Sequence, residues 1–467
     1  MKTRNYRFMF LILILFIFSG CAGSRMQTYL PYNTLARYPH HLLQHDGYII
    51  GIEKRVRDEI GDPEDGYPDR FIPVSHQKTS TATVSNEIRK RDRVFLKVTN
   101  DCSAMLVTHI DSHFNGQRKF NFNAYTDYKR DIKDYKLRYK DGYDKALISF
   151  RNNLEEKLKL ENSNGKPYSH ILVFAMGWNN DQYESIWRYN KIVEHLKKVS
   201  KDVNDTSFKP LVIGFTWPSV WYGIEDSWVK KKLIGFIFSY FNKANDADEI
   251  GYTIANWTIN NIVLNARDTY YKEHKKDLKI IAIGHSLGAR MLSRAIFSDE
   301  YIKPSCYNKA TSEVDLFIGL QGAFSAHRFI EGKGWEGYPY SEFYNRSTVF
   351  ALTSSIHDKA NPKVRFVTGA RHVGGRYGLN KAIKHTNVFK VIDEWKIEDW
   401  KKDDIVDQQE KVKTMLAQMK REQMKVIMVD ASSILVDDDS RNPPDAHNDI
   451  LDKDMAKLIW VLIKGLP

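Results

Sequence analysis

Cysteine is scarce in this sequence, with only Cys21, Cys102 and Cys306 among 467 residues. Their wide separation excludes a metal-binding cysteine cluster. Cys102 and Cys306 allow one disulfide in an oxidising compartment but do not establish it. The chain also lacks internal repeats and low-complexity blocks, which excludes a repeat architecture.

The N-terminus has the pattern of an export signal. Three basic residues precede an apolar run at 8–18, and two small residues then lead to Cys21. The run is shorter than the ~20 residues of a membrane-spanning helix. The segment resembles a bacterial lipoprotein signal, in which residues 1–20 are removed and Cys21 is fatty-acylated, although Phe18 stands where leucine is usual. This resemblance implies a lipid-anchored protein of the bacterial cell envelope that faces the periplasm; simple secretion and an uncleaved anchor are the alternatives.

The charge of the chain is basic. The formal net charge is +12, and +9 remains when the three basic residues of the signal are removed. A positive net charge of this size favours association with an anionic membrane surface. The same positive charge would also favour binding to nucleic acid, but the sequence contains no helix-turn-helix, zinc-finger spacing or ribonucleoprotein motif. We therefore expect a membrane partner and no nucleic acid, and the oligomeric state stays open.

From residue 141 onward, short apolar segments alternate with amphipathic ones. The short segments consist almost entirely of Ile, Val, Leu and Phe, as expected of strands that are buried on both faces. This alternation of strand-like and helix-like segments predicts an α/β fold, with helices on both faces of a mostly parallel sheet. The predicted strands are 171–176, 211–217, 278–283, 314–320, 348–352 and 425–429. The predicted helices are 141–160, 184–199, 248–274, 287–298, 398–422 and 450–463.

The preceding part of the chain, residues 21–140, is expected to be an N-terminal accessory region. Its predicted strands are 48–52, 93–98 and 105–110. They either open the main sheet or form a small appended β unit. The main domain is expected over 141–467, and within it the aromatic stretch 218–247 is either a lid or a buried helix.

The pentapeptide 284–288 reads Gly-His-Ser-Leu-Gly and joins a predicted strand to a predicted helix. A serine on such a turn projects its hydroxyl out of the chain, because the glycines remove side chains that would collide with it. The helix directs its N-terminal N–H groups and positive dipole end at the same point. Ser286 is therefore the expected nucleophile of a nucleophile elbow.

A serine nucleophile needs a histidine base and a carboxylate that orients the histidine. As the acid we select Asp358, which follows a predicted strand; the alternative is a turn aspartate that caps the next helix. As the base we select His447, in a turn-rich loop between the last strand and the last helix. His327 and His357 also lie on strand-end loops and are the alternatives.

The tetrahedral intermediate of acyl transfer needs two backbone donors for its oxyanion. The expected donors are the N–H groups of Leu287, directly after the serine, and Trp178, after the strand 171–176. An ordinary strand-to-helix turn is the alternative for the second segment. Gly177, Trp217 and Trp221 are the expected substrate-binding residues.

Four segments in a fixed order carry a family resemblance. They are Met-Gly-Trp-Asn at 176–179, Phe-Thr-Trp-Pro-Ser at 215–219, His-Ser-Leu-Gly at 285–288 and Ser-Ile-His-Asp-Lys-Ala at 355–360. Together they resemble the α/β-hydrolase superfamily, and in particular a lipase/esterase-like branch whose first segment reads His-Gly-Tyr-Asn or similar. The likeness covers about 165–465, and Met176 departs from the histidine that is usual there.

The resemblance implies an α/β-hydrolase fold and a triad of Ser286, His447 and Asp358 that requires no metal and no cofactor. We therefore expect a membrane-anchored serine hydrolase that cleaves an acyl ester through an acyl-enzyme. A non-catalytic envelope binding or scaffold protein on the same fold is one alternative. An amidase, peptidase or thioesterase with the same triad is another.

Overall fold

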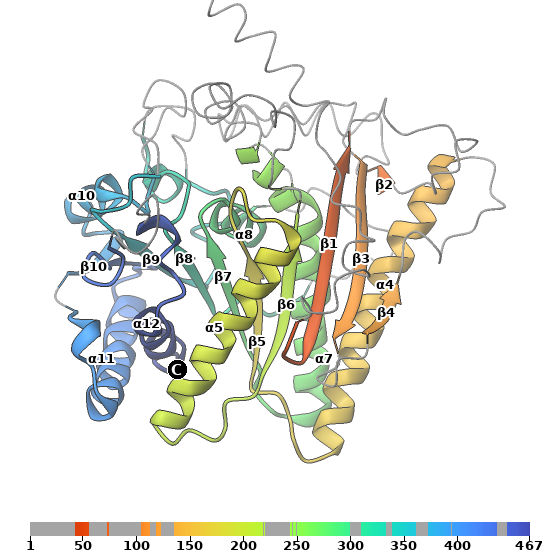
Figure 1. Ribbon diagram of the computed structural model, residues 1–467, viewed down its shortest axis with the longest axis horizontal. Helices are drawn as coiled ribbons and strands as arrows, with labels where there is room; N and C mark the ends of the chain where they lie inside the picture. The colour runs from red at the N-terminus through yellow and green to blue at the C-terminus, as the bar shows by residue number, and fades with distance from the viewer. Residues whose placement is uncertain are drawn as a thin grey trace, which may run out of the picture.

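In the computed structural model, the strands form one large sheet and the helices pack around it (Figure 1). The residues it describes are 43–55, 72–73, 104–112, 118–122, 135–217, 219, 243–244, 246–248, 250–298, 310–332, 339–360, 372–393, 395–436 and 446–467. Residues 1–42, with Cys21, lie outside them, as do Cys102, Cys306, Trp221 and nearly all of the aromatic stretch 218–247.

The sheet has eleven strands within the described residues, in the order β10-β11-β9-β8-β7-β5-β6-β1-β3-β2, with β4 paired to β3. Their bounds are β1 (Gly47–Arg55), β2 (Ile72–Pro73), β3 (Ala104–Ser112), β4 (Arg118–Phe122), β5 (His170–Ala175), β6 (Pro210–Thr216), β7 (Lys279–His285), β8 (Leu316–Leu320), β9 (Val349–Ser354), β10 (Phe389–Ile392) and β11 (Val426–Asp430). The strands from β10 to β1 pair in parallel, whereas β2, β3 and β4 pair antiparallel. The carboxyl ends of the parallel strands therefore share one edge.

Helices cover both faces of the sheet (Figure 1). Their bounds are α4 (Tyr135–Ser163), α5 (Gln182–Asp202), α7 (Leu264–His274), α8 (Leu287–Phe297), α10 (Arg376–Lys384), α11 (Lys402–Arg421) and α12 (Lys453–Lys464). Two π-helical segments, η5 (Gly251–Ala255) and η6 (Thr258–Val263), lead into α7. Helices α5, α11 and α12 lie on the side nearer to the viewer, and α7 and α8 lie behind the sheet.

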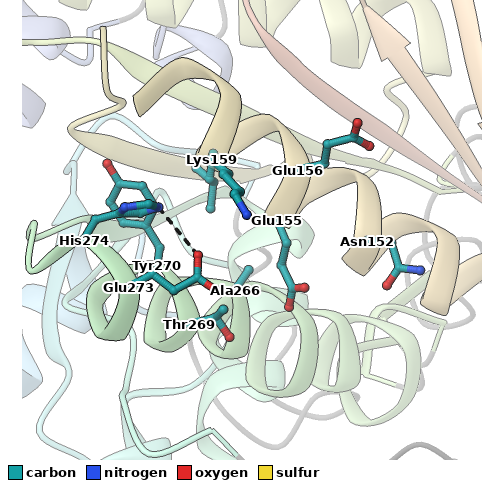
Figure 2. Close-up of a pocket in the computed structure, with 10 residues that line it drawn as sticks. Asn152, Glu155, Glu156, Lys159, Ala266, Thr269, Tyr270, Glu273 and His274 are labelled. Carbon is teal, nitrogen blue, oxygen red and sulfur yellow. Dashed lines mark ion pairs between the residues drawn. The ribbon is translucent and has the colours of Figure 1, made fainter. Parts of the chain in front are cut away.

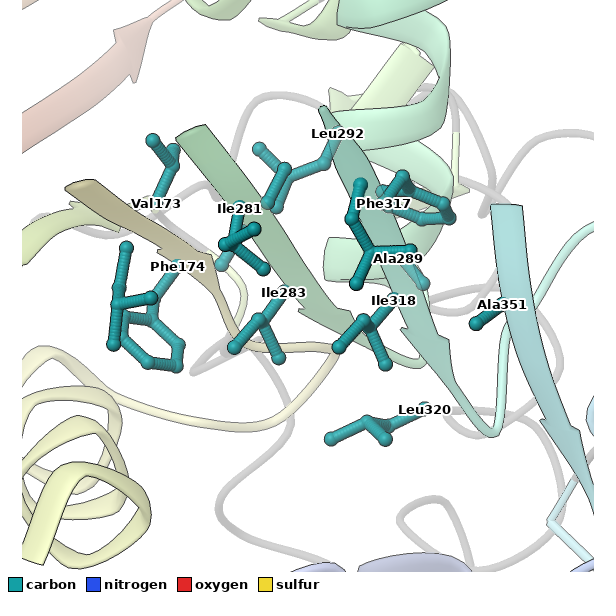
Figure 3. Close-up of a cluster of buried hydrophobic side chains, with 14 of the residues drawn as sticks. Val173, Phe174, Ile281, Ile283, Ala289, Leu292, Phe317, Ile318, Leu320 and Ala351 are labelled. Atoms are coloured by element: carbon teal, nitrogen blue, oxygen red, sulfur yellow. The ribbon is translucent and has the colours of Figure 1, made fainter. Parts of the chain in front are cut away.

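The core lies between the central strands and these helices. All six residues of β5 are buried, as are all eleven residues of α8. Figure 3 shows side chains of β5, β7, β8 and β9 together with Ala289 and Leu292 of α8. Burying one Ile, Leu or Phe side chain contributes about 1.5–3 kcal/mol. The uninterrupted apolar strands thus hold the centre of the sheet rigid where β7 ends.

A buried ion-pair cluster fixes α8 to the segment before η5. The Asp248 carboxylate accepts hydrogen bonds from Arg290 at 2.5 Å and from Arg294 at 3.2 Å. Burial raises the pKa of the Asp248 carboxyl, but the Arg290 and Arg294 guanidinium groups outweigh that effect and hold the pKa below its usual value. The carboxylate therefore stays charged, and the pairs restrain the helix that follows Ser286.

The predicted α/β fold is confirmed, with each of the six predicted strands from 171 to 429 present within a few residues. Strand β1 joins the main sheet in parallel to β6, which is the first of the two arrangements considered for the N-terminal strands. The predicted strand 93–98 lies outside the described residues, and the division of the chain at residue 140 stays a prediction. Helix α10 and the edge strand β10 were not predicted; β10 is only four residues long and its two middle residues are only partly buried.

Candidate functional site

Ser286 stands on the turn between β7 and α8. Its backbone has a φ of 53° and a ψ of −120°, a conformation that an L-residue adopts only under constraint. The constraint is visible, because the Ser286 N–H donates to the Leu320 carbonyl at 3.0 Å and its carbonyl accepts from Ala323 N–H at 3.1 Å. The turn is thus held by the segment that follows β8.

The two glycines of the pentapeptide are required because neighbouring backbone atoms leave no room for a Cβ at either position. A Cβ at Gly284 would lie 2.5 Å from the Ala289 Cα, and a Cβ at Gly288 would lie 2.1 Å from the Ala175 carbonyl oxygen. Both distances are far below van der Waals contact. The sharp strand-to-helix turn therefore depends on glycine at each position, as the sequence predicts.

Asp358 and His447 come together although 89 positions separate them. The His447 Nδ1 lies 2.9 Å from the Asp358 Oδ2, and both residues are 8% exposed. Asp358 lies on the loop after β9, and His447 lies in the 3₁₀ turn η9 (Ala446–Asn448) before α12. A carboxylate that accepts from Nδ1 fixes the imidazole tautomer, so Nε2 is the nitrogen that can take up a proton.

Gln321 supports the same carboxylate from the end of β8. Its Nε2 donates to the Asp358 Oδ2 at 3.1 Å and to the Gly374 carbonyl at 2.9 Å, while its Oε1 accepts from the Thr353 hydroxyl at 2.9 Å. The side chain is fully buried. Sequence analysis missed this residue, although its place directly after a buried strand at the carboxyl edge is a signal that points to the site.

The residue before the nucleophile also contacts the histidine loop. The His285 Nε2 lies 2.9 Å from the His447 carbonyl oxygen, and the two imidazole rings lie 4.8 Å apart between centroids. His447 therefore rests against the strand end that carries Ser286. The contact brings the loop of His447, together with its partner Asp358, to the strand end that precedes Ser286.

The loop after β5 approaches the elbow closely. A Cβ at Gly177 would lie 2.5 Å from the Ser286 Cβ and 3.0 Å from its Oγ. The Trp217 indole N–H donates to the Met176 carbonyl at 2.8 Å, and the Asn180 amide donates to the Gly177 and Trp178 carbonyls at 3.2 and 3.1 Å. The loop is therefore braced through backbone carbonyls, without the histidine that the resemblance leads one to expect at 176.

The expected oxyanion and substrate-binding residues have distinct positions. Leu287 is the first residue of α8, and Trp178 lies on the braced loop next to Gly177. Trp217 is 4% exposed and supports that loop through its indole; its role in binding substrate stays a prediction. Trp221 lies outside the described residues. The Asp315 carboxylate, directly before β8, pairs with Arg267 at 2.6 Å.

A hollow of about 250 Å³ between α4 and α7 lies elsewhere (Figure 2). Its walls carry Glu155, Glu273 and His274, on helices that precede β5 and β7 and therefore lie toward the amino ends of these strands. Burial raises the pKa of Glu155, and Glu273 adds to that effect against the opposing influence of Arg151. The hollow contains no serine or cysteine, and it lies apart from the elbow at the carboxyl edge.

A serine on a strand-to-helix turn at the carboxyl edge of a mostly parallel sheet defines the α/β-hydrolase fold, and the chain has this fold. Within it, residues 148–298 match a family described as an alpha/beta hydrolase of unknown function (DUF900). The matched segment runs from α4 through the elbow to the end of α8.

The other comparisons are sparse. No curated protein matches the chain. Among solved structures, the chain is similar to phospholipase PlaB from Legionella pneumophila in complex with thio-NAD, with 14% sequence identity and a TM-score of 0.20. That similarity covers 43% of this chain and 41% of the other, so the chain spans less than half of the phospholipase.

Proposed function

We propose that the protein is a serine hydrolase that cleaves carboxylic esters. The observation that carries this proposal is the 2.9 Å contact between His447 Nδ1 and Asp358 Oδ2, next to a serine held at φ 53° on a strand-to-helix turn. Acid, base and nucleophile come from three different strand ends, in the chain order Ser, Asp, His. This is the set of groups that acyl transfer requires.

In the proposed reaction the Ser286 Oγ attacks the acyl carbonyl while His447 Nε2 takes up the hydroxyl proton. The oxyanion that forms is held by the N–H groups of Leu287 and Trp178. Collapse of this intermediate breaks the ester bond, and His447 gives its proton to the departing alcohol. Water, activated by His447, then attacks the acyl-enzyme and releases the acid and Ser286.

Labelling with a fluorophosphonate tests the proposal directly. The reagent phosphonylates an activated serine, with loss of fluoride, and we expect one label per folded chain on Ser286, identified by peptide mass spectrometry. Heat-denatured protein serves as the control, because the labelling depends on the assembled site. Absence of Ser286-dependent labelling in folded protein would overturn the proposal.

The alternative of a non-catalytic binding or scaffold protein is based on Met176 and on the long N-terminal region, whose role the sequence does not indicate. The Trp217 indole supplies a brace at that position, at 2.8 Å from the Met176 carbonyl, which weighs against this alternative. Amide, peptide and thioester substrates share the same triad, so turnover of matched ester, amide and thioester compounds separates these classes. We place esters first because the family resemblance is to lipases and esterases.

Gly177→Ala tests the close approach of the β5 loop. The new Cβ would lie 2.5 Å from the Ser286 Cβ, so the loop must move, and we expect kcat/KM for an aryl ester to fall about tenfold or more. Gly165→Ala is the matched control: its φ of 71° costs about 1–2 kcal/mol of stability, but no atom lies within 4 Å of the added Cβ. Equal turnover of the two variants would show that the approach of Gly177 is unimportant.

We also propose that Cys21 is acylated and anchors the protein in the cell envelope, where the basic net charge of the chain favours anionic lipid. A bilayer-spanning helix needs about 20 apolar residues, and none of the helices in the described part of the chain meets that requirement. Cys21→Ser is expected to move the protein from the membrane fraction to the soluble periplasmic fraction or to leave it unprocessed. Incorporation of a labelled fatty acid measures the modification itself, and unchanged membrane association of the variant would contradict it.

A further inference from the structure

His285 is a buried histidine that the proposed reaction does not use. It is the last residue of β7, directly before Ser286, and its side chain is 1% exposed. Its Nε2 lies 2.9 Å from the His447 carbonyl oxygen, and its ring lies against the His447 ring at 4.8 Å and 45°. His447 is therefore held at two points: Asp358 holds its imidazole, and His285 holds its backbone.

The hydrogen bond shows that Nε2 of His285 carries a hydrogen. A carbonyl oxygen only accepts, so Nε2 carries the hydrogen, and the buried Nδ1 has no hydrogen-bond partner among the described residues. Burial lowers the pKa of His285 well below its usual value, and His447 and Arg188 lower it further, against a smaller opposing effect of the bond to His447. The Arg188 guanidinium is itself paired with Glu184 at 2.6 Å.

We propose that neutral His285 is a positioning residue that sets the distance between the nucleophile and its base, an inference that rests on the proposed function. The nucleophile and the donor to the base's backbone are consecutive residues at one rigid strand end. A displacement of the base by about 1 Å costs on the order of 10² in rate. A direct link from β7 to the η9 turn removes the freedom that would allow such a displacement.

The neutral state of His285 has a second effect on the same reaction. His447 becomes a cation when it takes the Ser286 proton, and a like charge against its ring would oppose that step. The imidazole of His285, kept uncharged by burial, donates a hydrogen bond without adding such a charge. A lysine or arginine at this position would supply the donor and the repulsion together.

The variants His285→Gln and His285→Asn test this role, because their side-chain amides differ only in how far they extend from the backbone. The glutamine amide nitrogen reaches the place of Nε2 and can still donate to the His447 carbonyl, whereas the asparagine amide ends near the place of Nδ1 and cannot. For a short-chain aryl ester we expect kcat of His285→Gln to stay within about threefold of wild type. We expect kcat of His285→Asn to fall at least tenfold, with KM changed by less than about twofold.

Titration with fluorophosphonate, run to completion, counts the competent sites, so kcat is expressed per site and loss of folded protein does not imitate loss of rate. The rate of labelling should fall in His285→Asn in parallel with kcat. Equal kcat of the two variants, or a change confined to the number of competent sites, would overturn the inference. If the asparagine variant does not fold, His285→Leu, which also lacks a donor, takes its place. Absence of Ser286-dependent turnover in the wild type would instead overturn the proposed function itself.

Discussion

Replacement of Ser286 by alanine is expected to lower kcat for a short-chain aryl ester by about 10⁶, to the small residual rate that the oxyanion hole and substrate binding still supply. The reason is chemical: the hydroxyl oxygen is the atom that forms the acyl-enzyme, and no other group on the turn can replace it. Only one oxygen is removed, and the backbone bonds of residue 286 to Leu320 and Ala323 remain. The measurement is the initial rate of phenolate release, with the thermal unfolding midpoint taken on the same sample.

Ser293→Ala is the matched control for this prediction. Ser293 lies on α8, is fully buried, and its hydroxyl bonds to the Arg290 carbonyl and the Tyr340 hydroxyl. Its loss is expected to lower stability by about 1–3 kcal/mol and to leave kcat within about twofold. Retention of turnover by Ser286→Ala, with turnover intact in Ser293→Ala, would exclude Ser286 as the nucleophile.

Asp358→Asn is expected to lower kcat by about 10⁴ while the fold is retained. An asparagine can turn its N–H₂ group toward the His447 Nδ1, which then must accept, so the proton moves to Nε2. A histidine with its proton on Nε2 cannot take up the proton of Ser286. The loss should appear in kcat with little change in KM, because the carboxylate acts through His447 and not on the substrate.

The control is Asp315→Asn, which removes the same charge from another strand of the sheet. The Asp315 carboxylate pairs with Arg267 at 2.6 Å and accepts from the Ile280 N–H at 2.7 Å, so its loss should lower stability and leave kcat within about twofold. If both variants lost the same factor in kcat per folded molecule, the orienting role of Asp358 would be wrong.

Much of this site could be predicted from the turn and from the order of the strand ends. Gly284 is needed because of a contact with Ala289 within the same turn, whereas Gly288 is needed because of the Ala175 carbonyl on the neighbouring strand. Asp358 and His447 follow from the chain order of strand ends, since parallel strands bring their carboxyl ends to one edge. Strand periodicity and apolar content were enough to find that edge.

The parts that were missed depend on contacts between distant segments. Gln321 reaches Asp358 across 37 positions and His285 reaches His447 across 162, and neither residue type is diagnostic by itself. The brace of Met176 by the Trp217 indole is equally non-local. Strand β10 was not predicted because it has only four residues, of which just the two at its ends are buried, so its apolar pattern is weak. Such features depend on tertiary packing, which local patterns do not encode.

The bond between His285 and the His447 carbonyl has a consequence for the order in which the chain is made. Synthesis proceeds from the N-terminus, so Ser286 emerges 161 residues before His447, the proposed base. During that interval a partly made chain holds a serine without a base to activate it. In the proposed reaction, Ser286 therefore has no base until η9 docks on the end of β7, so the complete chain is needed for activity.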